Sequence, residues 1–547
     1  MKMLERDENE IIQRWEKYLQ QNSQTSLDST STKNLQEILQ LFLEAKKVDD
    51  KFLVQIFYIS TGWMPNKIEI QELRFANAIG GLSAIEGKIY QQYQIFKKRF
   101  NKSSINFKYY SAGTTFIDIT HTLNYPFNTG IQRVVRNIGM NLLSDSSFEF
   151  VKWDLELGGW VLVEKEIVRN HLPFKKNTSL KGNGNSTSLT RFLKNSKCFP
   201  SLIVAAFWHG LFSSYRFLVA SEDSSRILEN KSVRKLMNLL KRAHKSSNVF
   251  YKMESKAVES PMLIGQQIFL VEPIQNIDIV LAHEYFEHLG KLSVLVYDLL
   301  PISNPEYFPQ ASIQGFPIYL KLLSFANKIL TISEFTKQQV SKYCDLKSNT
   351  FIKSQLLPSQ EISVENGHVN NVTGKLVLSV GSIEPRKNQI SLLQASEIIW
   401  SKGISFKLVI VGGQGWKNRE VLNLKSILQL RGRDLEFRND LSDEKLSELF
   451  RDSSLVVTIP WIEGFGLPLA EAMIYQKQII ASDISSHREI SDDPNILWVM
   501  PGDVPAIANS IESALMLNPS QSHTYRTNLL NSWREYSDSV KEFLTRL

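Results

Sequence analysis

The last third of the chain alternates short β-branched runs with amphipathic helical patterns, and this alternation constrains the fold more than any other feature. Strands are predicted at 375–382, 406–413, 454–460, 478–483 and 496–500. Helical spacing of apolar residues falls between them, at 388–400, 419–430, 443–450 and 467–475. Strands that alternate with helices at these lengths predict βαβ units and a parallel sheet.

A looser series of the same kind precedes it. We expect strands at 115–120, 201–208, 277–283, 291–301 and 326–333, a strand pair within 150–163, and a helix at 131–143. Two such series predict an α/β protein with two Rossmann-like domains, whose strands end at a shared cleft. Residues 1–110 carry helical periodicity and are predicted to form a helical N-terminal extension.

These patterns divide the 547-residue chain. A first Rossmann-like domain is expected at 111–335, a polar linker region at 336–373, a second Rossmann-like domain at 374–525 and a C-terminal helix at 526–547.

Composition narrows the class of protein. Apolar residues make up 43% of the chain, which is enough for large cores. The net charge of +7 favours an anionic ligand or membrane surface over a dedicated nucleic-acid binder. The chain has two cysteines, Cys198 and Cys344, in no CxxC pattern, which indicates neither a disulfide framework nor a zinc cluster. The first residues are charged and lack the apolar core of a signal peptide, so we expect a cytoplasmic protein. No uninterrupted apolar stretch is long enough to predict a spanning helix.

The stretch EGFGLPLAE, from Glu463 to Glu471, carries the strongest chemical signal. It joins a predicted strand to a predicted helix, so Glu463 lies at the strand tip and Glu471 about one turn into the helix. Gly464 and Gly466 allow close backbone approach, and Pro468 suits a first helical turn. Each glutamate alone is more often an ordinary surface or helix-start acid. Together, at two depths, they suit a polyol ligand such as a sugar joined to a ribose.

A second strand–loop–helix segment, KLVLSVGSIEPRKNQ, places Arg386 and Lys387 just before a helix. Two cations beside the free amides of a helix start suit a diphosphate. A solvated surface pair is the alternative when these two residues are considered in isolation.

The motifs SVGSIEPRKNQ, VGGQGW, EGFGLPLAEAM and ASDISSHREI resemble the retaining glycosyltransferases of family four, which have the GT-B fold. The resemblance is strongest after residue 374. Within the family, the sequence is similar to the branch that contains O-antigen mannosyltransferases. It implies that Arg386 and Lys387 bind the donor diphosphate, Glu463 the donor sugar and Glu471 the ribose. It also implies that further residues line the donor site: Gly381, Ser382, Gly464, Phe465, Gly466 and Leu467.

The first half of the chain matches more weakly. In NTGIQRVVRNI the resemblance implies that Gly130 lets the donor approach and that Thr129, Gln132 and Arg133 contact the acceptor; a plain helix cap is the alternative. Where many relatives carry His–Asp, this chain has Tyr297–Asp298, so Asp298 remains a candidate catalytic residue. Ser333 and Glu334 are expected to begin a helix.

The resemblance implies a hexosyltransferase that moves a sugar, mannose by preference, from a nucleotide-diphosphate sugar to a glycan or lipid-linked acceptor. GDP-mannose is the favoured donor and a UDP-sugar the second choice. The chain has no Asp-x-Asp motif, so no metal cofactor is expected.

Several alternatives stay open at this point. Basic helices at 87–100 and 231–245 fit either a solvated face or contact with an anionic inner membrane. A catalytically inactive partner that binds sugar nucleotides, or a GT-B epimerase or phosphorylase, would share the fold. Nucleic-acid binding is not expected, because no basic stripe with aromatic platforms stands out.

Overall fold

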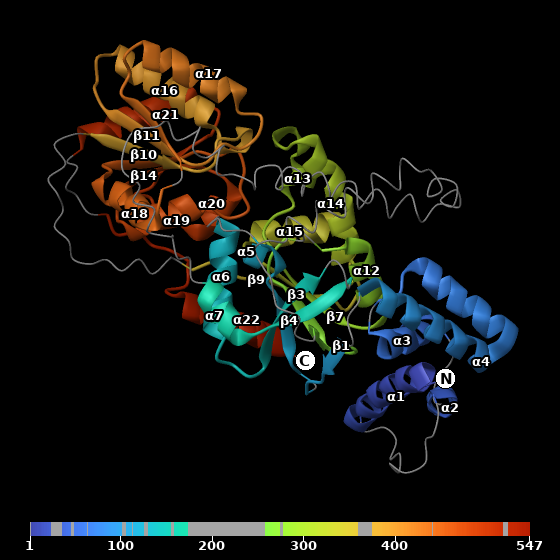
Figure 1. Ribbon diagram of the computed structural model, residues 1–547. Helices are drawn as coiled ribbons and strands as arrows, with labels where there is room; N and C mark the ends of the chain where they lie inside the picture. Colours follow the sequence, from blue (N-terminus) through green and yellow to red (C-terminus); the bar gives the residue numbers. More distant parts are fainter. Residues whose placement is uncertain are drawn as a thin grey trace, which may run out of the picture.

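The structure is a computed structural model of the 547-residue chain. It describes residues 2–22, 35–44, 49–62, 64–100, 105–111, 113–124, 130–154, 158–172, 258–273, 277–358, 375–439, 441–517 and 523–546. The expected strand at 201–208, the basic helix at 231–245, Cys198 and residues 359–373 of the predicted linker region lie outside these residues. The rest of the predicted linker, 336–358, is not a linker, because it contains most of one helix (Glu334–Tyr343) and a strand (Phe351–Ser354) that pairs within the first sheet. The described residues form two α/β lobes and a group of N-terminal helices (Figure 1).

The second lobe is built on a six-stranded sheet in the order β12-β11-β10-β13-β14-β15, and all the pairings described for it are parallel. The five strands expected from sequence are confirmed, and β12 is an additional strand that we did not predict. Their bounds are Leu376–Val380 (β10), Lys407–Val411 (β11), Leu435–Arg438 (β12), Leu455–Thr458 (β13), Gln478–Ser482 (β14) and Leu497–Val499 (β15).

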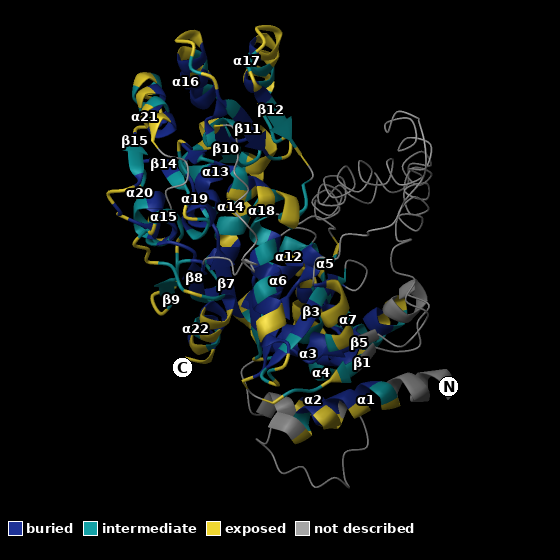
Figure 2. Ribbon diagram, turned by 90° about the vertical axis from the view of Figure 1, so that its left-hand side faces the viewer, coloured by how far each residue is buried: buried dark blue, intermediate teal, exposed yellow. Residues whose placement is uncertain are grey.

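Helices cover both faces of this sheet because successive strand side chains point to opposite sides. Val377 packs in a core with α16, α17 and α21, whereas its neighbour Leu378 packs in a core with α18, α19 and α20. The bounds of these helices are Gln389–Ser401 (α16), Arg419–Leu430 (α17), Asp443–Asp452 (α18), Leu467–Ile474 (α19), Ser485–Ile490 (α20) and Val504–Met516 (α21). Figure 2 shows the buried strands between helices with exposed outer faces.

The first lobe has a seven-stranded sheet in the order β4-β3-β2-β6-β7-β8-β9, parallel except for the β3–β4 hairpin. The strands are Thr115–Asp118 (β2), Phe148–Asp154 (β3), Gly159–Val163 (β4), Gln267–Leu270 (β6), Lys291–Val296 (β7), Ala326–Thr331 (β8) and Phe351–Ser354 (β9). The helical elements are Thr120–Asn124 (α5), Gly130–Leu142 (α6), Lys165–His171 (α7), Ile279–His288 (α12), Leu300–Ser303 (α13), Pro305–Tyr307 (η2), Gln310–Leu323 (α14) and Glu334–Tyr343 (α15).

One predicted strand of this lobe is wrong. The run IDIVLAH at 277–283 belongs to helix α12, because Asp278 caps the helix by accepting hydrogen bonds from the amides of Val280 and Leu281. The helix continues beyond the apolar run and buries Leu281 and Tyr285, four residues apart on one face. A short apolar run fits a strand or a buried helix equally well, and here the cap and the following turn decide.

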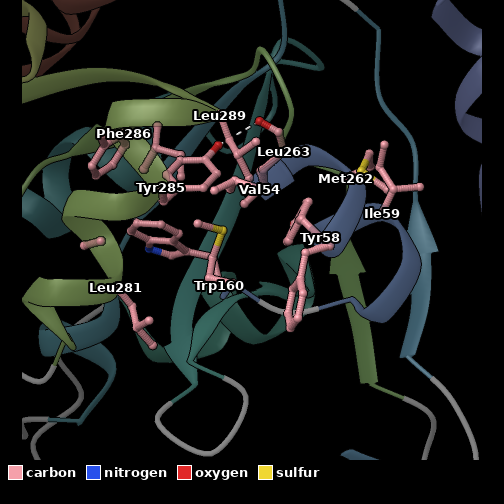
Figure 3. Packing of buried hydrophobic residues seen from close by; sticks show 14 of the residues in the cluster. Val54, Tyr58, Ile59, Trp160, Met262, Leu263, Leu281, Tyr285, Phe286 and Leu289 are labelled. Carbon is pink, nitrogen blue, oxygen red and sulfur yellow. Dashed lines mark hydrogen bonds between the residues drawn. The ribbon is translucent and has the colours of Figure 1, made fainter. Parts of the chain in front are cut away.

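The N-terminal helices are α1 (Lys2–Asn22), α2 (Leu35–Glu44), α3 (Asp50–Thr61) and α4 (Lys67–Phe100), which bends at Gly81. They share a hydrophobic core with the first lobe. Strand β1 (Ile105–Lys108) pairs with β5 (Val258–Pro261) beside them. Figure 3 shows α3 packing against the lobe, where Tyr285 donates a hydrogen bond to the carbonyl of Leu263 at 2.7 Å. The labelled residues of this junction are Val54, Tyr58, Ile59, Trp160, Met262, Leu263, Leu281, Tyr285, Phe286 and Leu289.

The chain crosses back to the first lobe at its end. Helix α22 (Trp533–Thr545) follows the second lobe in sequence but packs against α6, and Figure 1 shows this red helix among the elements of the first lobe. Lys541 forms an ion pair with Asp145, and Gln267 donates to the carbonyl of Leu544 at 3.3 Å. The expected C-terminal helix therefore belongs to the first lobe by its contacts.

Among the helices of the described residues, none combines the length and the hydropathy that a membrane crossing requires.

Candidate functional site

Glu463 and Glu471 lie on the two sides of the turn that connects β13 to α19, and both are buried, with 4% and 6% of their surface exposed. Gly466 ends this turn with φ at +132°, a conformation that favours glycine. A Cβ at this position would also lie 2.7 Å from the imidazole of His487. Pro468 occupies the first helical turn, as expected.

Lys387 contacts Glu463 at the carboxyl edge of the sheet, where the neighbouring strands β10 and β13 end. The Lys387 ammonium forms an ion pair with the Glu463 carboxylate, and both side chains are largely buried. Lys387 is presented by the short helix η3 (Pro385–Lys387) at the carboxyl end of β10, next to β13. The two segments that the sequence singled out separately therefore form one site, although the charged partners are 76 positions apart in the chain.

Asn388 holds the η3 turn in place, a role that the sequence analysis did not identify. Its backbone adopts a left-handed conformation with φ at 57°. The side-chain amide of Asn388 donates to the carbonyl of Ile459 at 3.0 Å and to that of Pro501 at 2.6 Å. Asparagine tolerates this conformation better than most residues, and its position between RK and a helical run was the available signal.

Arg386 is oriented by a second buried acid. Its guanidinium lies 2.7 Å from the carboxylate of Glu384, whose side chain is 1% exposed. The Arg386 carbonyl accepts a hydrogen bond from the amide of Trp461 at 2.8 Å, which links η3 to the glutamate turn. Glu384 was not predicted to matter, although it stands two residues before Arg386.

Positive charge surrounds Glu463. Burial raises the pKa of Glu463, but Lys387, His487 and Arg386 lower it more, and the net pKa lies well below its ordinary value. His487 is fully buried, with Nε2 3.9 Å from the Glu463 carboxylate and Nδ1 3.2 Å from the carbonyl of Ser482. Glu463 is therefore a carboxylate, an acceptor for hydroxyl groups. His487 lies in the ASDISSHREI motif but was given no role from sequence.

Asp298 approaches this group from the first lobe. It follows β7, and a Cβ built on Gly464 would lie 2.9 Å from its Cβ and 2.5 Å from the carbonyl oxygen of Tyr297. Burial raises the pKa of Asp298, and the nearby Arg386 lowers it in part. Tyr297 points its hydroxyl to the carbonyl of Val271 at 2.9 Å, so its side chain supports the first lobe.

Hydrogen bonds from both lobes hold the start of α15 next to the glutamate turn. Ser333 caps α15, as expected, by accepting from the amide of Thr336 at 3.1 Å. Its hydroxyl also donates to the carbonyl of Gly464 at 2.6 Å. Glu489 of the second lobe accepts hydrogen bonds at 2.6 Å from the amides of Glu334 and Phe335, which begin α15. The lobes are thus held together next to Glu463.

Of the remaining candidates from the first lobe, Gly130 and Arg133 lie beside α19. A Cβ on Gly130 would lie 2.8 Å from a methyl of Leu467, so glycine permits this approach of the lobes. Gln132 is buried, and Thr129 lies outside the described residues. Arg133 bridges to the second lobe, with one guanidinium nitrogen 2.8 Å from Glu471 and another 3.0 Å from Asp443.

Gly381 and Ser382 lie on the loop that carries Lys387. A Cβ on Gly381 would lie 3.3 Å from Lys387 Cδ, and the Ser382 carbonyl accepts from Gln389 at 2.8 Å. Phe465 is buried within the glutamate turn. The expected donor-site residues of the second lobe therefore lie on the segments after β10 and after β13 that carry Lys387, Glu463 and Glu471.

A second pair of buried acids, not predicted from sequence, lies at the carboxyl ends of β2 and β6. Asp118 accepts from the indole of Trp160, and Glu272 accepts from the amide and hydroxyl of Thr122 at 3.0 and 2.7 Å. Burial raises the pKa of Asp118 to about 6 and that of Glu272 to about 8. Glu272 anchors the start of α5 and belongs to the framework of the first lobe.

Two Rossmann-like lobes that meet at the carboxyl ends of their strands, with α22 returning to the first lobe, define the GT-B class of fold. Residues 362–535 match the family described as Glycosyl transferases group 1. This match falls on the second lobe, where the motifs of the sequence predicted a similarity to glycosyltransferases.

The chain is similar to several curated mannosyltransferases. It is 29% identical over 278 residues to the serotype-specific mannosyltransferase WbdA of Escherichia coli, a match that covers 46% of this chain and 33% of the relative. It is 26% identical over 242 residues to the O-antigen chain mannosyltransferase B of Escherichia coli, covering 42% and 63%. The chain therefore spans about a third of the length of the first relative.

A solved structure, Anabaena Alr3699/HepE in complex with UDP and glucose, is 14% identical and aligns with a TM-score of 0.46. The alignment covers 80% of this chain and 100% of that structure.

Proposed function

We propose that this protein is a hexosyltransferase that moves a sugar, mannose by preference, from a nucleotide-diphosphate donor to a glycan or lipid-linked acceptor in cell-surface polysaccharide synthesis. The observation that carries the proposal is the buried Lys387–Glu463 pair at the ends of β10 and β13, within a group 1 glycosyltransferase domain. The similarity to O-antigen mannosyltransferases supports the choice of sugar and pathway.

In this proposal the donor diphosphate takes the place of Glu463 as the partner of Lys387, with Arg386 as the second cation. Lys387 can exchange a carboxylate for a phosphate because both are oxygen anions. Glu463, released from the ion pair, accepts hydrogen bonds from the sugar hydroxyls, and Glu471 accepts those of the ribose. The negative charge that grows on the leaving diphosphate is then stabilised by cations already fixed in place.

Retention of configuration is part of the proposal. The leaving diphosphate itself takes the proton of the incoming hydroxyl on the same face of the sugar, so the protein positions the reactants and needs no separate general base. Asp298 reaches the site from the first lobe, next to Gly464, and this position supports the proposal that it contacts the sugar or the acceptor. The mechanism does not require a metal ion.

GDP-mannose is the proposed donor. Among the similar proteins is a GDP-Man:Man(3)GlcNAc(2)-PP-Dol alpha-1,2-mannosyltransferase of Mus musculus, 26% identical over 211 residues, 36% of this chain and 40% of that protein. The proposed acceptor is a growing glycan on a lipid carrier. This places the protein in the cytoplasm at the inner membrane surface, where the basic, apolar-studded segment 87–100 of α4 would contact anionic lipid.

The direct test incubates the purified chain with GDP-mannose, and in parallel with UDP-sugars, and measures transfer to lipid-linked glycan acceptors by mass spectrometry. Glu463→Gln is the matched variant, since it keeps the shape of the side chain and removes its charge. We expect transfer by the unsubstituted protein and its loss in the variant. Donor binding without transfer to any acceptor would favour a catalytically inactive partner, and isomerisation of the free donor would favour an epimerase.

A further inference from the structure

Arg133 connects the two lobes at the site where the ribose is proposed to bind. It lies in the first turn of α6, and its guanidinium contacts Glu471 of α19 at 2.8 Å and Asp443 of α18 at 3.0 Å. The Arg133 side chain is 17% exposed and that of Glu471 is 9% exposed, whereas Asp443 is more open at 43%. A small pocket at this junction is lined by these three residues and by Leu446, Ser447, Phe450 and Tyr475.

This arrangement solves an electrostatic problem of the second lobe. Glu471 and Asp443 are both acids, they come from adjacent helices of one lobe, and each disfavours the charge of the other. A planar guanidinium with several donors can bind both carboxylates at once, which a lysine ammonium does less well. The group that compensates the two acids thus comes from the other lobe.

Helix α6 holds Arg133 rigidly enough for such a role. Val134, Val135 and Ile138 are buried on its inner face. At Gly130, three residues earlier, an added Cβ would lie 2.8 Å from a methyl of Leu467 at the start of α19, and α22 packs against α6. The position of the guanidinium is therefore fixed by the contact between the lobes.

We propose that Arg133 is a positioning residue of the donor site, which fixes the Glu471 carboxylate for the ribose hydroxyls and makes nucleotide affinity depend on the first lobe. The inference rests on the proposed function, which assigns Glu471 to the ribose. It moves Arg133 from the acceptor side, where the motif had placed it, to the donor side.

The charged groups that face Glu471 support this role. They are Arg133 from α6, Asp443 from α18 and Lys387 from η3. Burial raises the pKa of Glu471, Arg133 lowers it, and Asp443 raises it again. Without Arg133, only Lys387 would oppose burial and Asp443, so Glu471 would take up a proton at a higher pH. A protonated carboxyl is a poorer acceptor for two hydroxyl groups.

The test measures GDP and UDP binding by calorimetry, and KM and kcat for the sugar donor, in the full chain with Arg133→Met and Arg133→Lys. We expect Arg133→Met to weaken nucleotide binding by about 10- to 100-fold, the range for loss of a hydrogen bond to a charged group. KM for the sugar donor should change more than kcat. The loss of nucleotide affinity should be larger at about pH 6 than at about pH 8. Arg133→Lys should fall between, and it provides a second variant if Arg133→Met does not fold.

Lys541→Met is the matched control. It also removes a cation that pairs with an acid across distant segments, but Asp145 precedes β3, at the opposite end of the sheet from the site. We expect unchanged nucleotide binding in this variant. If both Arg133 variants fold and bind nucleotide like the unsubstituted protein at both pH values, the inference is refuted while the proposed function stands. If the unsubstituted protein binds neither nucleotide, both are overturned.

Discussion

Gly464 is the position where a single methyl group should separate the two lobes. A Cβ at Gly464 would lie 2.5 Å from the carbonyl oxygen of Tyr297 and 2.9 Å from the Cβ of Asp298, both in the first lobe. The first of these neighbours is backbone, so it cannot turn away as the end of a flexible side chain would. The carbonyl of Gly464 is at the same time held by the hydroxyl of Ser333 at 2.6 Å. Gly464→Ala therefore forces either the glutamate turn or the lobe contact to move.

The size of the effect follows from this overpacking. Adding one methyl to a closely packed position costs about 1–3 kcal/mol when the surroundings must shift. If the strain is relieved by opening the lobes, it acts against the closed form, in which Asp298 and Glu463 lie together. Because ~1.36 kcal/mol corresponds to a factor of ten in rate, the expected loss in kcat/KM is about 5- to 150-fold.

The assay compares sugar transfer and thermal unfolding in Gly464→Ala with those in Gly413→Ala. Gly413 lies in the loop after β11 of the same lobe, and a Cβ there would meet no atom within 4 Å. Both variants lose the same backbone freedom of glycine, so their difference isolates the contact between the lobes. Small-angle scattering on the free protein should show a larger radius of gyration for Gly464→Ala only.

Near-normal transfer by folded Gly464→Ala would refute the reasoning, because the lobes would then not need to approach at this point during catalysis. Equal losses in both glycine variants would also count against it, since the effect would then come from the backbone of the second lobe.

Three further outcomes are expected. Lys387→Ala should abolish transfer and also destabilise the protein by about 3–5 kcal/mol, because it leaves Glu463 buried without its ion-pair partner. Combining Lys387→Ala with Glu463→Gln should restore the melting temperature but not transfer. A melting temperature that is not restored would contradict the pairing. The pKa of Glu272 is raised from 4.5 to about 8, so the folded protein binds an extra proton between these values and loses stability as pH rises through this window. The melting temperature should therefore fall between about pH 5 and about pH 8 less steeply in Glu272→Gln than in the unsubstituted protein. Glu489→Gln should weaken the cap on α15 by about 0.5–2 kcal/mol and shift the free protein toward forms in which the two lobes are open. Small-angle scattering measures this shift. An unchanged scattering profile would show that this cap does not hold the two lobes together.

Local patterns predicted those parts of the molecule in which a residue's neighbours in sequence are also its neighbours in space. The strand β13, the glutamate turn with Gly464 and Gly466, and the start of α19 follow each other directly, so their order and spacing were readable. The same holds for β10, Arg386 and Lys387. That these two segments belong to one site was implied only by the family resemblance, and the structure shows the reason, because β10 and β13 are neighbouring parallel strands that end at a common edge.

The tertiary structure alone decided which charges pair. Arg133 and Glu471 are 338 positions apart, and their contact depends on how one lobe rests on the other, which periodicity does not encode. The same applies to Ser333 and Gly464 and to the return of α22 to the first lobe. The helix at 279–288 was also beyond sequence reading, because a short apolar run buries equally well as strand or helix. The spacing of residues along the chain specifies where helices and strands form. Which residues contact one another across the lobes depends on the packing of two buried surfaces, because burial requires that the shapes of both surfaces match.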